Sequence, residues 1–127
     1  MKFTKKSLGQ NFLVDKNIIK KIVNLTKIKD KNIIEIGPGR GALTDEILKK
    51  KPKVLHIIEK DFTLYKLLRK KYFNVKNIKI YNHDILNFGL EKILKKNSII
   101  FGNLPFNISS QILVKVLRFK NLSSYFK

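Results

Sequence analysis

The sequence predicts an α/β fold built around a parallel β-sheet, and two observations support this prediction. Short apolar runs alternate along the chain with amphipathic stretches of helical spacing. Strands that alternate with helices form βαβ units with right-handed crossovers. The chain has 127 residues and no cysteine, which fits one domain of ordinary size without a disulfide framework or a thiolate site.

The first half of the chain is predicted to hold two helices and two strands. Asp15 is suited to cap a helix over 15–26, whose isoleucines and valine fall on one face. An apolar strand follows at 32–36, and a helix at 42–50 ends in lysines that suit a helix C-terminus. Pro52 prevents this helix from continuing, and the second strand covers 54–58.

The second half continues the same alternation. Asp61 is suited to cap a helix with a leucine-rich side, and a third strand follows at 78–81. A short helix is expected at 90–96, a fourth strand at 98–101 and a closing helix at 108–119. The apolar stripe of the closing helix would consist of Ile112, Leu113, Val116 and Leu117.

These elements together predict one half of a Rossmann-like sheet with about four parallel strands. In the strand order 3-2-1-4, the strand at 98–101 would form an edge. Its sequence, SIIFG, is apolar throughout, and an uncovered apolar edge favours aggregation. We therefore expect either that a partner covers this edge or that the chain is shorter than the fold to which it belongs.

The charge of the chain indicates a polyanionic partner. The chain carries 28 basic and 9 acidic side chains, a net charge of +19. Phosphate backbones attract such proteins by charge neutralisation and counterion release, so nucleic acid is favoured. No apolar run reaches the roughly 20 residues that span a bilayer, and the N-terminus lacks a signal-peptide core. We accordingly expect a cytoplasmic protein with no membrane partner.

Four polar or glycine-rich segments follow the predicted strands, where ligands bind in open α/β sheets. These segments are GPGRG at 37–41, Glu59, Asp84 and the tetrapeptide at 103–106. Glycines let a ligand approach the backbone closely. Glu59 lies 22 residues after Gly37, a spacing at which a carboxylate can accept hydrogen bonds from both hydroxyls of a ribose. The glycine segment also fits G-x-G-x-x-A, so alone it does not separate a dinucleotide from another adenosine cofactor. No spacing of histidines and carboxylates predicts a metal site.

The remaining two segments suit an adenine and a reacting amine. Asp84 is placed either to accept from an adenine amine or to cap a turn. In Asn103-Leu-Pro-Phe106, the Asn103 side chain and a backbone carbonyl could hold an exocyclic amine, and Pro105 would fix the turn. Phe106 offers a ring on which an extruded base could stack.

Five segments, taken in order, resemble the ribosomal RNA adenine dimethyltransferases. This family comprises the KsgA type, which acts on small-subunit rRNA, and the erythromycin-resistance type, which acts on large-subunit rRNA. The resemblance runs from Lys6 to about Ser110, and NLPFNIS is closer to the small-subunit type. The segments are SLGQNFL at 7–13, EIGPGRGALT at 35–44, IEKD at 58–61, HDI at 83–85 and GNLPFNIS at 102–109.

The resemblance implies a Rossmann-like methyltransferase fold, S-adenosylmethionine as methyl donor, and the exocyclic amines of two adjacent adenosines as acceptors. The substrate would be small-subunit rRNA or a pre-assembled small subunit, and the enzyme a monomer. By position, the cofactor contacts would be Asn11, Leu13, Gly37, Glu59, Asp84 and Asn103. The catalytic residues would be Asn103, Pro105 and Phe106, where Phe106 replaces the Tyr common in the small-subunit group.

The length of the chain departs from the family. Members carry a seven-stranded catalytic sheet and a small helical C-terminal domain, so residues 1–127 would form the N-terminal portion of a class I methyltransferase catalytic domain, without either. Three other functions stay open at this point. They are a non-catalytic rRNA-binding relic, a large-subunit rRNA adenine methyltransferase of the erythromycin-resistance type and, from GPGRGA alone, half of an NAD-type dehydrogenase. The dehydrogenase accounts for neither NLPF nor the charge.

Overall fold

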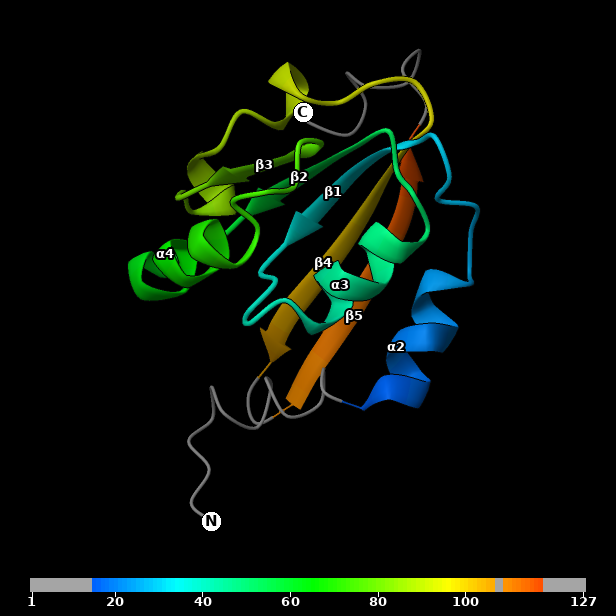
Figure 1. Ribbon diagram of the computed structural model, residues 1–127, viewed down its shortest axis with the longest axis horizontal. Coiled ribbons are helices and arrows are strands. Elements are labelled where there is room, and N and C mark those ends of the chain that lie inside the picture. The colour runs from blue at the N-terminus through cyan, green and yellow to red at the C-terminus, as the bar shows by residue number, and fades with distance from the viewer. Residues whose placement is uncertain (1–14, 107–108, 118–127) are drawn as a thin grey trace.

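The computed structural model of the protein describes residues 15–106 and 109–117. It comprises three α-helices, two 3-10 turns and one five-stranded sheet (Figure 1). In chain order the elements are α2 (Lys16–Val23), β1 (Asn32–Ile36), α3 (Ala42–Lys49), β2 (Val54–Ile58), α4 (Phe62–Lys71), β3 (Ile78–Tyr81), η1 (Ile85–Asn87), η2 (Leu90–Lys92), β4 (Ser98–Phe106) and β5 (Ser109–Leu117).

The sheet has the strand order β3-β2-β1-β4-β5. The first four strands are parallel, as the sequence predicts, and their order is the predicted 3-2-1-4. Each crossover between them is long enough for a helix or a pair of turns. The predicted α/β fold with about four parallel strands is therefore confirmed.

The helix predicted at 108–119 is wrong, because residues 109–117 form β5. This strand runs antiparallel to β4, with Ile99 paired to Val116 and Phe101 to Val114. The apolar residues of this segment have helical spacing, but β4 has an edge of unpaired backbone N–H and C=O groups. A segment rich in β-branched residues can pair with these groups as a strand, and this pairing prevails over the local helical pattern. The apolar edge expected to need a partner is thus covered by the chain itself.

The helix predicted at 90–96 is also wrong, since only the 3-10 turn η2 forms there. The segment is instead fixed by hydrogen bonds to the sheet. The Asn32 amide donates to the Ile93 carbonyl (3.0 Å) and to the Ser98 hydroxyl (2.8 Å). Ile93 and Leu94 can then pack on the sheet without a regular helix.

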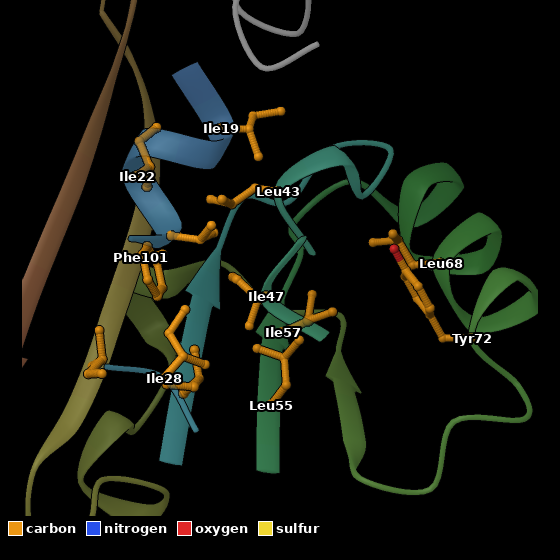
Figure 2. Packing of buried hydrophobic residues seen from close by; sticks show 13 residues of the cluster. Ile19, Ile22, Ile28, Leu43, Ile47, Leu55, Ile57, Leu68, Tyr72 and Phe101 are labelled. Carbon is orange, nitrogen blue, oxygen red and sulfur yellow. The ribbon is translucent and has the colours of Figure 1, made fainter. Parts of the chain in front are cut away.

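The core has two parts, one on each face of the sheet. Helices α2, α3 and α4 all pack on one face, where Ile19, Leu43, Ile47 and Leu68 meet strand residues such as Phe101 (Figures 1 and 2). The η1–η2 segment covers the other face. Successive residues of a strand point to opposite faces of the sheet, and both faces of β1 are covered. Its NIIEI sequence therefore supplies side chains to both layers of the core. Glu35 shares the helix-covered face with Ile33.

Candidate functional site

The carboxyl ends of β1, β2 and β3 lie level with Gly102 of β4, which continues to Phe106. Ile36 of β1 pairs with Ile58 of β2 and with Gly102 of β4, and Ile58 pairs with Tyr81 of β3. The residues that come next in sequence are therefore brought into one row at one edge of the sheet. They are Gly37, Glu59, Asn82 and Asn103.

The glycine loop after β1 is built from left-handed backbone. Gly37, Gly39 and Gly41 have φ values of 69°, 61° and 95°, a region that side-chain-bearing residues rarely adopt. The Gly37 N–H donates to the Ile58 carbonyl (3.0 Å), which joins the loop to the end of β2. Gly41 caps α3 without a side chain, so the first N–H groups of that helix face the loop.

The Glu59 carboxyl is 6% exposed at the end of β2. Its Oε2 accepts from the Asp61 N–H (2.8 Å). The Asn82 amide donates to the carbonyls of Glu59 (2.9 Å) and Lys60 (3.1 Å), and so fixes the backbone directly after the strand end. A carboxylate held in this way is a rigid acceptor for hydroxyl donors.

Asp84 follows β3 by three residues and lies beside the same row. Its Oδ1 accepts from the Leu86 N–H (3.0 Å), so it does cap the turn η1. Its Oδ2 lies 3.7 Å from the Lys60 ammonium, in a partly exposed ion pair. The capping function occupies one oxygen and does not exclude a ligand at the other.

The tetrapeptide at 103–106, predicted to be catalytic, is placed only by its backbone. Residues 103–106 continue β4, so the turn that Pro105 was expected to fix is wrong. The strand is prolonged because β5 pairs with it as far as Phe106 and Ser109. Asn103 lies directly after Gly102 in the row, while Asn11 and Leu13 lie outside the described residues.

Sequence reasoning missed Glu35 as a member of the site. The pKa of Glu35 is raised to about 8, chiefly by burial; the Thr44 hydrogen bond opposes this rise, and the nearby carboxylates of Asp45 and Glu59 add to it. Thr44 donates to Glu35 Oε1 at 2.6 Å. A carboxylate within an otherwise apolar strand was the available signal, since carboxylates are almost never fully buried without a partner.

A second missed group holds the glycine loop from outside. The Tyr72 hydroxyl bridges Asp45 Oδ1 (2.6 Å) and the Gly41 carbonyl (3.2 Å). The Lys71 ammonium donates to the Arg40 carbonyl and to Asp45 Oδ2, both at 3.0 Å. A Cβ at position 41 would overlap the Tyr72 hydroxyl. The end of α4 thus clamps the loop, and the helical spacing of Leu64, Leu68 and Tyr72 was its only sequence signal.

Acidic groups concentrate at this edge although the chain is strongly basic. Five of its nine acidic residues lie in or beside the row, and a cationic ligand would be favoured by the four besides Glu35, which burial keeps protonated at neutral pH. Within the described residues, no three histidines or carboxylates group as a metal site, and no helix is long and apolar enough to cross a membrane. The five are Glu35, Asp45, Glu59, Asp61 and Asp84.

Comparison with solved structures confirms the fold. A dimethyladenosine transferase from Plasmodium falciparum is 23% identical with a TM-score of 0.54, over 68% of this chain and 41% of that one. The 23S rRNA methyltransferase ErmE is 22% identical with a TM-score of 0.54, over 71% of this chain and 47% of that one. Both similarities show a methyltransferase fold of the Rossmann-like kind.

Comparison of sequences identifies the family. The ribosomal RNA small subunit methyltransferase A of Pelagibacter ubique (strain HTCC1062) is 52% identical over 111 residues, which are 87% of this chain and 42% of that protein. The chain thus spans less than half the length of this relative. The family model for ribosomal RNA adenine dimethylase matches residues 1–126. The protein therefore belongs to the ribosomal RNA adenine dimethylase family.

Proposed function

We propose that the protein transfers methyl groups from S-adenosylmethionine to the exocyclic amines of two adjacent adenosines in small-subunit rRNA. The observation that supports this most is the row that contains Gly37, Glu59 and Asn103 at one sheet edge, with Asp84 beside it, in a chain of the adenine dimethylase family. The name of the Pelagibacter relative favours the small subunit over the large one. Residues 1–127 would form the N-terminal portion of the catalytic domain.

The residues at this edge fit S-adenosylmethionine. The molecule offers two ribose hydroxyls, and the buried Glu59 carboxylate can accept a hydrogen bond from each. Its adenine amine suits the acceptor at Asp84, beside Lys60. Its positive charge suits an edge rich in carboxylates, and the left-handed loop at Gly37 allows a close backbone approach. When bound, it supplies an electrophilic methyl group on its sulfonium.

The protein's part in the transfer would be positioning. Asn103 would accept from the target amine and hold its lone pair towards the methyl carbon, and Phe106 would stack on the extruded base. The nitrogen–methyl bond forms as the carbon–sulfur bond breaks, and the amine proton leaves to solvent afterwards. No covalent enzyme intermediate and no dedicated base is needed.

An Asn103→Ala variant tests this role. It should retain part of the S-adenosylmethionine binding in a calorimetric titration and lose transfer of tritiated methyl groups to unmethylated small ribosomal subunits. Equal loss of binding and transfer would contradict the proposed role of Asn103. The non-catalytic alternative, an rRNA-binding relic, predicts RNA binding by the wild-type chain with no saturable binding of S-adenosylmethionine. Family membership favours this methyl donor over a nicotinamide dinucleotide.

A further inference from the structure

The outward face of α4 combines a pair of aromatic rings with cations. Phe62 is 59% exposed at the first position of the helix, and Tyr65 is half-buried. The two rings stack, with 6.0 Å between centroids and 27° between planes. The combination of a stacked ring pair with cations, rather than the exposure of one phenylalanine, distinguishes this face. This ring pair, with the cations below, is here called the α4 platform.

Two cations lie against the rings of the platform. The Lys66 ammonium lies 5.1 Å from the Phe62 centroid, and the Arg69 guanidinium lies 5.7 Å from that of Tyr65. Arg69 also donates to the Tyr65 hydroxyl at 3.2 Å. Both cations therefore lie over the faces of the rings, and a base that stacked on Phe62 in place of Lys66 would leave that ammonium beside the phosphate of the same nucleotide.

Helical spacing explains why these residues share a face. Positions 62, 65, 66 and 69 follow the i, i+3, i+4, i+7 pattern of one helix side. Leu64 and Leu68, which lie on the opposite side, are buried at 8% and 0% exposure. Leu64 and Leu68 thus pack α4 against the core, whereas the α4 platform faces away from it.

The α4 platform lies next to the candidate site. Asp61 caps α4 through the Leu64 N–H (3.1 Å), and Glu59 accepts from the Asp61 N–H. Phe62 therefore follows the row of the candidate site by only three residues. The helix itself contains no acidic residue and ends in Arg69, Lys70 and Lys71. A ligand that reached the site along this helix would meet rings and positive charge.

We propose that the α4 platform binds an unpaired stretch of the RNA substrate, with a base stacked on Phe62 and the neighbouring phosphates near Lys66 and Arg69. The partner is single-stranded RNA because every base has a face for stacking and every phosphate a charge for the two cations. A duplex would hide its base faces. A membrane surface would need a broader apolar face than one ring pair between cations. The proposal rests on the proposed function, which makes RNA the substrate.

Binding of short RNAs to the full chain tests the platform without any methyl transfer. The probes are a fluorescent 12-nucleotide oligoadenylate and an abasic strand with the same number of phosphates. Phe62→Ala should weaken binding of the oligoadenylate about tenfold, within the usual range for loss of one stacking contact. It should leave the abasic strand within twofold of wild type. Phe73→Ala is the matched control, because Phe73 is 77% exposed but lies past the far end of α4.

A second pair of variants separates location from total charge. Lys66→Gln with Arg69→Gln should weaken binding of both strands more than Lys29→Gln with Lys53→Gln, which removes the same charge at exposed lysines before β1 and β2. Equal effects of the two pairs, or of Phe62→Ala and Phe73→Ala, would overturn the proposal. Loss of binding to phosphatidylserine vesicles with unchanged RNA binding would overturn it in favour of a membrane. Absence of methyl transfer would contradict the proposed function and leave these binding results standing.

Discussion

Glu35 shows how a single buried carboxyl couples this site to pH. Burial raises its pKa to about 8, above an ordinary value of 4.5. Between these values the folded chain holds a proton that the unfolded chain has lost. The free energy of unfolding therefore falls as pH rises from about 4.5 to about 8, and the effect is complete above pH 8.

Glu35→Gln should remove this dependence while keeping an acceptor for Thr44. The comparison is made between pH 6.5 and 8, to keep His56 from contributing to the pH dependence. Burial lowers the pKa of His56 to about 4 in the folded chain, so this histidine affects stability mainly below pH 6.5, where it becomes protonated in the unfolded chain. Across that window the wild type should lose about 1–2 kcal/mol relative to the variant. Urea unfolding at pH 6.5, 7.2 and 8.0 measures this difference. Parallel pH profiles for both proteins would show that Glu35 is ionised in the folded chain.

At the scale of residues, the sequence predicted positions better than surroundings. Gly37, Glu59 and Asp84 could be placed because each follows an apolar run, and the ends of parallel strands share one edge. Glu35 and Tyr72 could not, since their importance depends on contacts with Thr44 and Asp45 that join separate elements. For Asp84 the sequence allowed a turn cap or a contact with an adenine amine. The Leu86 contact confirms the cap at one oxygen and leaves the other oxygen open to a ligand.

At the scale of elements, α4 braces the glycine loop through Tyr72. Its hydroxyl donates to Asp45 and lies 3.2 Å from the Gly41 carbonyl, and it is buried with its ring in the core. Tyr72→Phe leaves the ring in place and removes these contacts. Loss of the hydrogen bond to the charged Asp45 side chain, which is partly exposed, costs on the order of 1–2 kcal/mol, so the loop should open more often in the variant.

Two measurements on Tyr72→Phe test the brace. The free energy of unfolding in urea should fall by about 1–2 kcal/mol, and amide exchange at residues 37–41 should become faster than elsewhere in the sheet. Tyr65→Phe serves as the control, because the Tyr65 hydroxyl has an exposed contact with Arg69. If the two variants lost stability equally, or if exchange rose throughout the sheet, the brace would not act on the loop in particular.

The two elements that the sequence predicted wrongly have a common cause. At 109–117 and at 90–96, local helical spacing competed with hydrogen bonds to the sheet, and the sheet prevailed. The edge of β4 is satisfied by nine paired residues of β5, and Ile93 is tied to Asn32 at the start of β1. Local propensity contains no information on either contact, whereas for α2, α3 and α4 both levels agree.

For the whole molecule, charge is divided between two tasks. The chain carries +19, yet four acidic side chains besides the buried Glu35 surround the row at the carboxyl edge, which would favour a cationic cofactor. RNA binding should therefore weaken steeply with salt and cofactor binding only slightly. Between 50 and 200 mM KCl, we expect the affinity for single-stranded RNA to fall at least about tenfold, by release of counterions.

Fluorescence anisotropy for RNA and calorimetry for S-adenosylmethionine would check this difference. The cofactor affinity should change by less than about threefold over the same range, because its contacts are short and partly buried. Equal salt dependence of both ligands would mean that they bind the same charged surface, and that the acidic edge does not form a separate cofactor site.

The central claim is that the carboxyl edge of the sheet holds S-adenosylmethionine, and calorimetric titration of the wild type and Glu59→Gln tests it most directly. Glu46→Gln, at a carboxyl on the surface of α3 that pairs with Lys49 (2.6 Å), is the control. We predict saturable one-to-one binding to the wild type and the control, and roughly 10- to 100-fold weaker binding to Glu59→Gln through loss of charged hydrogen bonds. No saturable binding to the wild type, or equal affinity in all three proteins, would contradict the claim.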